Sequence, residues 1–488
     1  MFASPAGDPP RGDLGNGTYR NPILGGDHPD AGAIRVGADY YLTHSSFDSA
    51  PGLSIWHSRD LVSWRLEGYA LSKYYGNVWA PYLCEHQGTY YIYFPCDGRL
   101  HVVSAASPLG PWREPVALDI QGIDPAHIAD SNERRFLHFS AGRMVELAAD
   151  GLSAISSVRT VLKAWPIPAD WRVECECLEA PKLFWRDGYC YLTVAQGGTA
   201  GPSTSHMVIS ARSRNVDGPW EFSPHNPIVH TASRQERWWS QGHGRLVEAP
   251  NGSWWMTYHA YENGYQSLGR QTLLLPMEWT KDGWYRVPAG VSSDRALPKP
   301  PGDALAQPAF SDDFAARELG PQWQFCKGVG QGRCQTGDGR LTLGAAGEKF
   351  ADGAFVFVTA PDHAYEVEVD VETDGQSEAG LVLFYDPEHA SGLRIAADGL
   401  ALRRVFAGSP VAGLHVPARR ATLRLVNDHQ DVEALYALPG QPWQRVGRAW
   451  EISGLQHNTL YGFRSVRPAL YACGSGAATF RQFRYLRL

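Results

Sequence analysis

The sequence lacks the features that mark membrane-spanning, nucleic-acid-binding and disordered chains. No apolar run reaches the ~18 residues needed to cross a bilayer, and Lys and Arg form no basic block. The formal net charge of −7 argues against an anionic membrane surface or a nucleic acid as partner. Charged residues make up only 19% of the 488 residues, too few for a solvated, unfolded chain. We therefore expect a globular protein that binds neither membranes nor nucleic acids, with a homo-oligomer as an open alternative to a monomer.

The start of the chain lacks the pattern of a signal peptide. Residues 1–18 form a polar arm rich in Pro and Gly, with no basic region and no apolar core. We expect a cytoplasmic protein. The alternative is a periplasmic or secreted protein whose signal peptide was removed ahead of this sequence.

Cysteine is scarce. Eight cysteines are too few for a disulfide framework in a chain of 488 residues. Cys175 and Cys177 lie close together, but no second pair follows at the spacing of a zinc site. We therefore expect free thiols in a reducing compartment.

Aromatic residues and glycine are abundant, and they recur in a regular pattern in the first half of the chain. Five times a polar turn leads into a run of aromatic and β-branched residues, as in a hairpin entering a strand. Repeats of about 40–50 residues are typical of propeller blades. The pattern predicts an all-β fold with a five-bladed β-propeller over residues 19–287. The five turns begin at Gly37, Gln87, Asn132, Arg186 and Asn251.

The repeat identifies one equivalent position in each blade, eleven or twelve residues before an aromatic residue of the strand. Equivalent positions in a closed radial array lie on one ring, so we expect these side chains to converge at the axis. Carboxylates placed that close together are costly unless they are used. The competing interpretation is a set of solvated residues at strand starts. The five positions hold Asp30, Trp79, Asp124, Glu179 and His243.

Such a ring can hydrolyse a glycosidic bond. One carboxyl group protonates the leaving oxygen, while a second activates water or attacks the anomeric carbon. A third carboxylate tunes the acid. The face of an aromatic residue such as Trp79 stacks on the C–H surface of a sugar.

Longer motifs make the chain similar to a known family. From about Arg20 to Val287 it resembles glycoside hydrolase family 43, inverting five-bladed propeller enzymes that include β-xylosidases and α-L-arabinofuranosidases. The resemblance implies that Asp30 is the general base, Glu179 the general acid, and Asp124 the residue that tunes the acid and orients the substrate. The motifs are RNPILGGDHPDAGAIRVGADYYLTHSSF, NVWAPYL, GIDPAHI, CLEAPKLF, SQGHGRLVE and LGRQTLLLPMEW.

The turn after Asp30 departs from the family pattern. The family usually has Asp followed by Pro, whereas this chain has Ala31 and Gly32 after Asp30. Asp27 is therefore a rival base. It lies fourteen rather than eleven residues before Tyr41, so the repeat favours Asp30.

The resemblance also implies residues that bind the sugar. Arg270 matches an arginine that hydrogen-bonds the terminal sugar, and a surface salt bridge is the alternative. Phe47 and Trp79 resemble the hydrophobic wall of that subsite, with core packing as the alternative for Phe47. His243 matches a histidine at the propeller centre, often near a bound calcium ion or its water shell. Calcium prefers oxygen ligands, so a structural ion reached through water and no ion at all both stay open. No cofactor is expected for catalysis.

The second half of the chain predicts a different β domain. Residues 288–308 are Pro-rich and weakly patterned, as linkers are. Short strands at regular spacing follow and predict a jelly-roll-like β-sandwich over residues 309–488. This half resembles the concanavalin-like sandwich of many β-xylosidases in the family. The resemblance implies a domain that packs on the propeller and closes one side of the pocket.

Together these observations predict an exo-acting, inverting glycosidase that releases terminal xylose or arabinofuranose from oligosaccharides of the plant cell wall. The alternatives are an exo-β-galactosidase of the same family, a retaining fructan hydrolase on a five-bladed propeller, and a non-catalytic sugar-binding propeller. The fructan hydrolases usually begin with an Asn-Asp-Pro-Asn block, which this sequence lacks.

Overall fold

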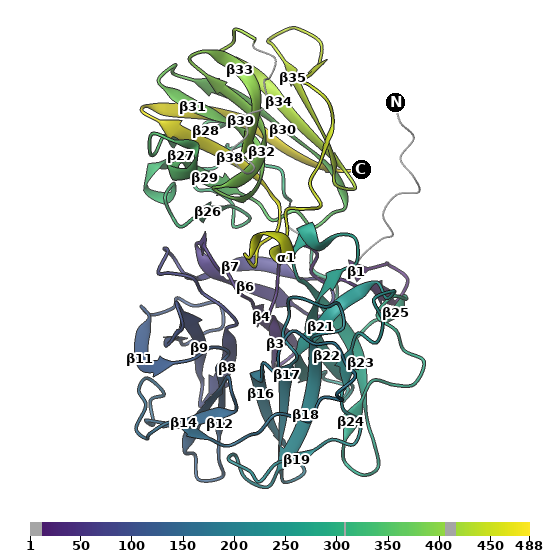
Figure 1. Cartoon of the computed structure of the whole chain (residues 1–488). Coiled ribbons are helices and arrows are strands. Elements are labelled where there is room, and N and C mark those ends of the chain that lie inside the picture. The colour runs from purple at the N-terminus through teal and green to yellow at the C-terminus, as the bar shows by residue number, and fades with distance from the viewer. Residues whose placement is uncertain (1–11, 307–308, 406–415) are drawn as a thin grey trace.

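The protein consists of two β-rich domains stacked end to end (Figure 1). A computed structural model describes residues 12–306, 309–405 and 416–488. Residues 1–11 of the predicted arm and residues 307–308 of the predicted linker lie outside the described residues. Within the described ranges the α-helical structure is one short segment, α1 (His457–Leu460), and no helix there is long and apolar enough to span a membrane. The predicted all-β class is confirmed.

The first domain contains five antiparallel sheets, each a local meander of four strands, with one extra strand in the fourth sheet. Because each sheet is formed by consecutive segments, the aromatic and β-branched runs pack between neighbouring sheets in buried clusters. These five sheets fit the five predicted blades. They comprise β3 (Gly32–Val36), β4 (Asp39–Thr43), β6 (Gly52–Ser58) and β7 (Arg65–Leu71); β8 (Tyr82–His86), β9 (Thr89–Cys96), β10 (Arg99–Ala105) and β11 (Val116–Gln121); β12 (Ala126–Ala129), β13 (Arg135–Phe139), β14 (Arg143–Leu147) and β15 (Arg159–Thr160); β16 (Glu179–Arg186), β17 (Tyr189–Gln196), β18 (Met207–Ser213), β19 (Glu221–Phe222) and β20 (Val229–His230); and β21 (Trp238–Glu248), β22 (Trp254–Glu262), β23 (Gln271–Trp279) and β24 (Tyr285–Arg286).

The first blade is tied to the last one by the segment that precedes it. The backbone N–H of Ile23 donates to the carbonyl of Thr272 in β23 at 3.0 Å. A small sheet also joins β1 (Gly12–Asp13) and β2 (Thr18–Arg20) to β25 (Leu297–Pro298), which lies in the predicted linker. These contacts hold residues 21–31, and with them Asp30, against the fifth blade.

The second domain is a sandwich of two antiparallel sheets whose inner faces form a single buried cluster. The apolar alternation along β30 (Ala364–Thr373) and β34 (Arg420–Asp428) places four residues in this core: Val367, Val369, Leu423 and Leu425. One sheet contains β26 (Gln324–Cys326), β29 (Ala354–Phe357), β31 (Ser377–Asp386), β32 (His389–Ala396), β33 (Gly399–Val405) and β38 (Arg467–Gly474); the other contains β27 (Cys334–Gly337), β28 (Arg340–Gly344), β30 (Ala364–Thr373), β34 (Arg420–Asp428), β35 (Asp431–Ala437), β36 (Gln444–Arg445), β37 (Trp450–Glu451) and β39 (Ala477–Arg487). The 3-10 segments are η1 (Gln266–Leu268), η2 (Gln331–Arg333) and η3 (Phe350–Asp352).

The two domains share a sheet edge. A short propeller strand, β5 (Ser49–Ala50), pairs with β26 of the sandwich, with Ala50 opposite Phe325. Beside it, the Arg464 Nε–H of the sandwich donates to the buried Asp48 carboxylate at 2.9 Å. The sandwich is thereby fixed on the side of the first blade, next to the segment that carries Phe47.

Candidate active site

The five predicted ring residues lie at the start of the innermost strand of each sheet or just before it, except His243, which lies within β21. Three of them, Asp30, Asp124 and His243, have φ values of 63°, 55° and 57°, in the left-handed region. Residues other than glycine seldom adopt this conformation because it is sterically strained, and such strained residues cluster at functional sites. The backbone thus turns sharply at the same point in three blades.

Asp30 is the centre of the polar cluster. Arg270 donates to both of its carboxylate oxygens, at 3.0 and 3.3 Å. His243 Nδ1 and His259 Nδ1 lie 3.3 and 3.2 Å from Asp30 Oδ1, and the Ser45 hydroxyl donates to Oδ2. Burial alone would raise the pKa of Asp30, but Arg270, together with the two histidines, holds it well below its usual range. Asp30 is therefore held in its ionised form at neutral pH.

Glu179 has the opposite electrostatic environment. Burial, followed by the charges of Asp124 and Asp30, raises the pKa of its carboxyl well above the usual value. Asp124 is tied to the same blade start, because its Oδ2 accepts the Ala180 N–H at 3.0 Å. Burial and then the charge of Asp30 raise the pKa of Asp124 to about 7. The site thus combines one carboxylate that stays ionised with one carboxyl that stays protonated.

A buried lysine lies next to this cluster. Lys182 is 3% exposed, and its Nζ is 3.2 Å from His243 Nε2. Burial lowers its pKa to about 8, against the opposing effect of Asp124. Its ammonium group in turn lowers the pKa of Asp124, so Lys182 limits how far that carboxyl is neutralised.

Sequence reasoning missed Ser45 and His259, although the repeat contains the signal for both. Each lies four residues beyond the aromatic used to align the blades, Tyr41 in the first blade and Trp255 in the fifth. Both contact Asp30, so this second equivalent position also points at the centre of the propeller.

The rival base Asp27 occupies a different place. Its Oδ1 accepts the backbone N–H of Arg270 at 3.1 Å, so it supports the arginine from behind. Burial raises the pKa of Asp27 to about 7. Asp30, not Asp27, receives the side chain of Arg270.

Aromatic side chains from both domains lie beside Arg270, and the ring of Phe47 is 5.9 Å from its guanidinium group. Phe47 and Trp79 lie on adjacent segments, since the Phe47 N–H donates to the carbonyl of Val78 at 2.9 Å. From the sandwich, the ring of Phe463 lies 4.6 Å from the Arg270 guanidinium. The sandwich therefore does reach the site, as the resemblance implied, through a side chain that the sequence did not single out.

Two family models match the chain. That of glycosyl hydrolases family 43 matches residues 19–285, and that of the beta-xylosidase C-terminal concanavalin A-like domain matches residues 311–486. The chain belongs to glycosyl hydrolase family 43.

Curated relatives and a solved structure agree with this assignment. A xylan 1,3-beta-xylosidase of a Vibrio species is 32% identical over 321 residues, and a non-reducing end alpha-L-arabinofuranosidase of Bacteroides ovatus is 32% identical over 341 residues. The matches cover 56% and 64% of this chain, and they span only 58% and 62% of those relatives. The crystal structure of a GH43 protein from Bacillus licheniformis has a TM-score of 0.87 at 27% identity, covering 96% of this chain and 100% of that one.

The donor set of this family 43 domain does not suit the calcium ion considered for His243. Asp30, His243 and His259 bring one carboxylate oxygen and two ring nitrogens within 4.8 Å of one another. Calcium takes six to eight oxygen ligands, and the same carboxylate already pairs with Arg270. The nearby Lys182 ammonium adds further positive charge. We therefore assign no role to a metal here.

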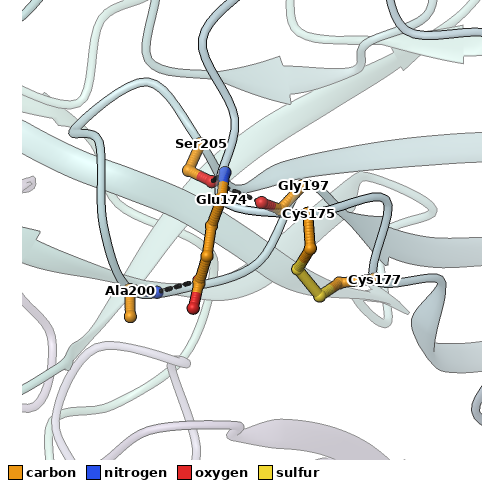
Figure 2. Close-up of a disulfide and its surroundings, with 6 residues drawn as sticks. All are labelled: Glu174, Cys175, Cys177, Gly197, Ala200 and Ser205. Carbon is orange, nitrogen blue, oxygen red and sulfur yellow. Dashed lines mark hydrogen bonds between the residues drawn. A yellow bond between two sulfur atoms is a disulfide. The ribbon is translucent and has the colours of Figure 1, made fainter. Parts of the chain in front are cut away.

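The expectation of free thiols throughout is wrong for one pair. Cys175 and Cys177 form a disulfide two residues before Glu179, whereas the other six cysteines are free (Figure 2). The number of cysteines excludes a framework of several disulfides, but it says nothing about a single bond between two cysteines that are two residues apart. Glu174 beside it accepts the Ala200 N–H at 2.9 Å. The segment that leads to Glu179 is thus fastened to the loop after β17.

That loop also reaches the Asp30 side of the site. Gly197 N–H donates to the carbonyl of Glu176 at 3.1 Å. Two residues later, Thr199 Oγ1 lies 3.3 Å from His259 Nε2, and His259 contacts Asp30. The disulfide segment and Asp30 are therefore linked through one short loop.

Proposed function

We propose that the protein is an exo-acting, inverting glycosidase that releases terminal xylose or arabinofuranose from plant cell-wall oligosaccharides. The observation that carries this proposal is geometric: the Asp30 carboxylate is paired with Arg270, and Asp124 and Glu179 lie together at the starts of two neighbouring blades. This arrangement lowers the pKa of Asp30 and raises that of Glu179. The names of the two curated relatives, a xylosidase and an arabinofuranosidase, support the substrate class.

In the proposed reaction, Asp30 removes a proton from a water molecule whose oxygen attacks the anomeric carbon. Glu179 donates its proton to the glycosidic oxygen as the bond between that oxygen and the anomeric carbon breaks. Asp124 sustains the high pKa of Glu179 through its negative charge. Two carboxyl groups and water complete the chemistry, so no cofactor takes part.

The remaining residues bind the sugar in this proposal. Arg270 holds hydroxyl groups of the terminal sugar and keeps Asp30 ionised. Phe47, Trp79 and Phe463 supply apolar faces for its C–H surface. Phe463 of the second domain adds an aromatic wall on one side of Arg270, and this supports exo action.

A panel of nitrophenyl glycosides tests the substrate class. We expect turnover of β-D-xylopyranoside or α-L-arabinofuranoside, whereas preference for β-D-galactopyranoside would favour the galactosidase alternative. Proton NMR of the first product should show inverted anomeric configuration. Retention would favour the fructan-hydrolase type of mechanism, and binding without turnover would favour a sugar-binding propeller.

The Glu179→Gln variant tests the acid. Loss of general acid catalysis typically costs about 10²–10⁴-fold in rate, and the loss should be larger for natural xylosides than for nitrophenyl substrates, whose leaving groups need less protonation. Equal, small effects on both substrates would assign the acid to another residue.

A further inference from the structure

A cavity lies between the two domains, next to the site described above, and its lining shares Asp27, Ser45 and Phe47 with that site. It encloses about 150 Å³ and is lined by residues of the first blade and of the sandwich. Asp30, Glu179 and Arg270 are not part of its lining. Its rim includes Tyr69 and Gln322, which are partly exposed, so the cavity opens to solvent at the seam of the domains.

Four polar atoms on buried lining residues have no hydrogen-bond partner within the described ranges. They are His28 Nδ1, Asp48 Oδ1, Ser465 Oγ and Arg467 Nε, on residues that are 8%, 1%, 0% and 5% exposed. Asp48 Oδ1 has only an ion pair at 3.8 Å, with Arg467. Buried polar groups are nearly always hydrogen-bonded, and each unsatisfied one costs about 1–3 kcal/mol. Their concentration in one cavity indicates that a polar occupant completes it.

The charges around the cavity indicate an uncharged occupant. The guanidinium groups of Arg464 and Arg467, which line the cavity, are already paired with the carboxylates of Asp48 and Asp386. A charged guest would leave this set unbalanced in a poorly solvated space. Trp56, also in the lining, adds an apolar aromatic face. Carboxylates, guanidinium groups and an aromatic face together suit a neutral molecule with several hydroxyl groups.

The size of the cavity limits that molecule to a single small ring. An engineered apolar cavity of about 150 Å³ binds benzene, so a cavity of this volume accommodates a six-membered ring. We propose that the cavity is a second sugar site, which binds a free pentopyranose such as D-xylose. The choice of a pentose rests on the proposed function, because that reaction releases one.

An occupant of this cavity would contact two supports of Arg270. Asp27, in the lining, accepts the backbone N–H of Arg270 at 3.1 Å. Phe47, also in the lining, has its ring 5.9 Å from the Arg270 guanidinium. We therefore expect a pentose bound here to change turnover at the active site in addition to competing for it.

Crystals of the full-length protein soaked with D-xylose test the site directly. We expect density for the sugar in the interdomain cavity, with hydroxyl groups next to Asp48 Oδ1 and Ser465 Oγ. Ordered water alone in the cavity, or D-xylose in the active site only, would overturn the proposal.

Two substitutions of Ser465 distinguish the effect of filling the cavity from the effect of losing a hydrogen bond to the sugar. Ser465→Leu fills the cavity, whereas the matched control Ser465→Ala removes only the hydroxyl and keeps the space. Ligand-observed NMR titration should show that the Leu variant raises the Kd for D-xylose in the cavity by about tenfold or more, because overpacking and sugar cannot share the volume. The Ala variant should retain binding with a smaller loss. Equal cavity binding by all three proteins contradicts the proposal.

A second position keeps the test decisive if thermal melting shows that Ser465→Leu does not fold. Gln322→Ala at the partly exposed rim should weaken D-xylose binding several-fold without affecting the fold, and an unchanged Kd there contradicts the proposal. In kinetics, added D-xylose should inhibit the wild type with a non-competitive component that the cavity variants lose.

These results distinguish the inference from the proposed function. Turnover of pentosides with D-xylose confined to the active site defeats only the second site. D-xylose in the cavity of a protein that hydrolyses no glycoside defeats only the proposed activity.

Discussion

Phe463 of the sandwich stacks against Phe47 of the propeller, with ring centroids 6.2 Å apart and planes 19° from parallel. The same ring lies 4.6 Å from the Arg270 guanidinium, and His457 of α1 stacks on it at 3.7 Å. The aromatic wall beside Arg270 is therefore built by two domains. This arrangement makes the sandwich part of the site as well as a support for the propeller.

Truncation of Phe463 should weaken binding of the terminal sugar. An aromatic contact contributes about 0.5–1.5 kcal/mol beyond its buried area, so we expect Phe463→Ala to lower kcat/KM roughly threefold to tenfold, mainly through KM. Steady-state kinetics on a nitrophenyl pentoside measures this effect. Tyr461→Ala is the matched control, because Tyr461 is on the same segment but 89% exposed. Equal losses in the two variants would mean that the segment, not the ring, matters.

The pH dependence of kcat/KM should follow the two perturbed carboxyl groups. The proposed mechanism needs Asp30 ionised and Glu179 protonated, so we expect the acidic limb below the usual range of Asp and the alkaline limb well above that of Glu. Arg270 lowers the pKa of both groups. We therefore expect Arg270→Gln to move both limbs to higher pH, independent of any loss in amplitude.

The control for this profile is Arg286→Gln, which removes an exposed arginine paired with Glu278. Its limbs should coincide with those of the wild type. An acidic limb that stays in place in Arg270→Gln would show that Asp30 is not the group titrating there.

Asp124 should make the fold less stable as the pH rises. Its pKa is about 7 in the folded protein against 3.8 as the reference value. Between these values the folded state binds a proton that the unfolded state has released, so stability falls with rising pH by an amount on the order of a few kcal/mol. Asp124→Asn stays neutral and should raise the Tm relative to the wild type at pH 8, with a much smaller difference near pH 4.

Thermal melting at several pH values measures that difference. The exposed Asp119 supplies the control, since Asp119→Asn removes a carboxylate that lies at the surface. A Tm difference for Asp124→Asn that does not change with pH would contradict the assigned pKa.

The blade repeat was sufficient to predict the centre of the site. Equivalent positions of a repeated unit converge at the propeller axis, so counting residues along the chain was enough to find them. These positions hold Asp30, Asp124, Glu179 and His243. His259 and Ser45 obey the same rule at a second position and were predictable in principle. Local periodicity thus carries information about residues that the propeller itself brings together.

Contacts made by the second domain could not be predicted in this way. Phe463 reaches Arg270 only because β26 of the sandwich pairs with β5 and fixes how the domains meet. No sequence repeat relates β5 to β26, and neither the length nor the spacing of these strands predicts that they pair. The interdomain cavity depends on the same docking and was equally hidden.

The Cys175–Cys177 disulfide provides the last prediction, because it lies two residues before Glu179. A dithiol reductant would transfer two electrons and two protons to the bond and leave two thiols. The segment from Glu174 to Glu179 would then gain conformational freedom, and ordering it again costs entropy. We expect treatment with dithiothreitol, or the double variant Cys175→Ser with Cys177→Ser, to lower kcat by up to about tenfold, since misplacement of a catalytic group slows the chemical step.

Mass spectrometry after alkylation shows which cysteines have been reduced, and kinetics on the same samples measures the loss. The free, partly buried Cys334 of β27 supplies the control, so Cys334→Ser should respond to dithiothreitol as the wild type does. The double serine variant should not respond to the reductant. If it slowed as much as the wild type, the effect would arise elsewhere in the molecule, and the disulfide would have no part in holding Glu179 in place.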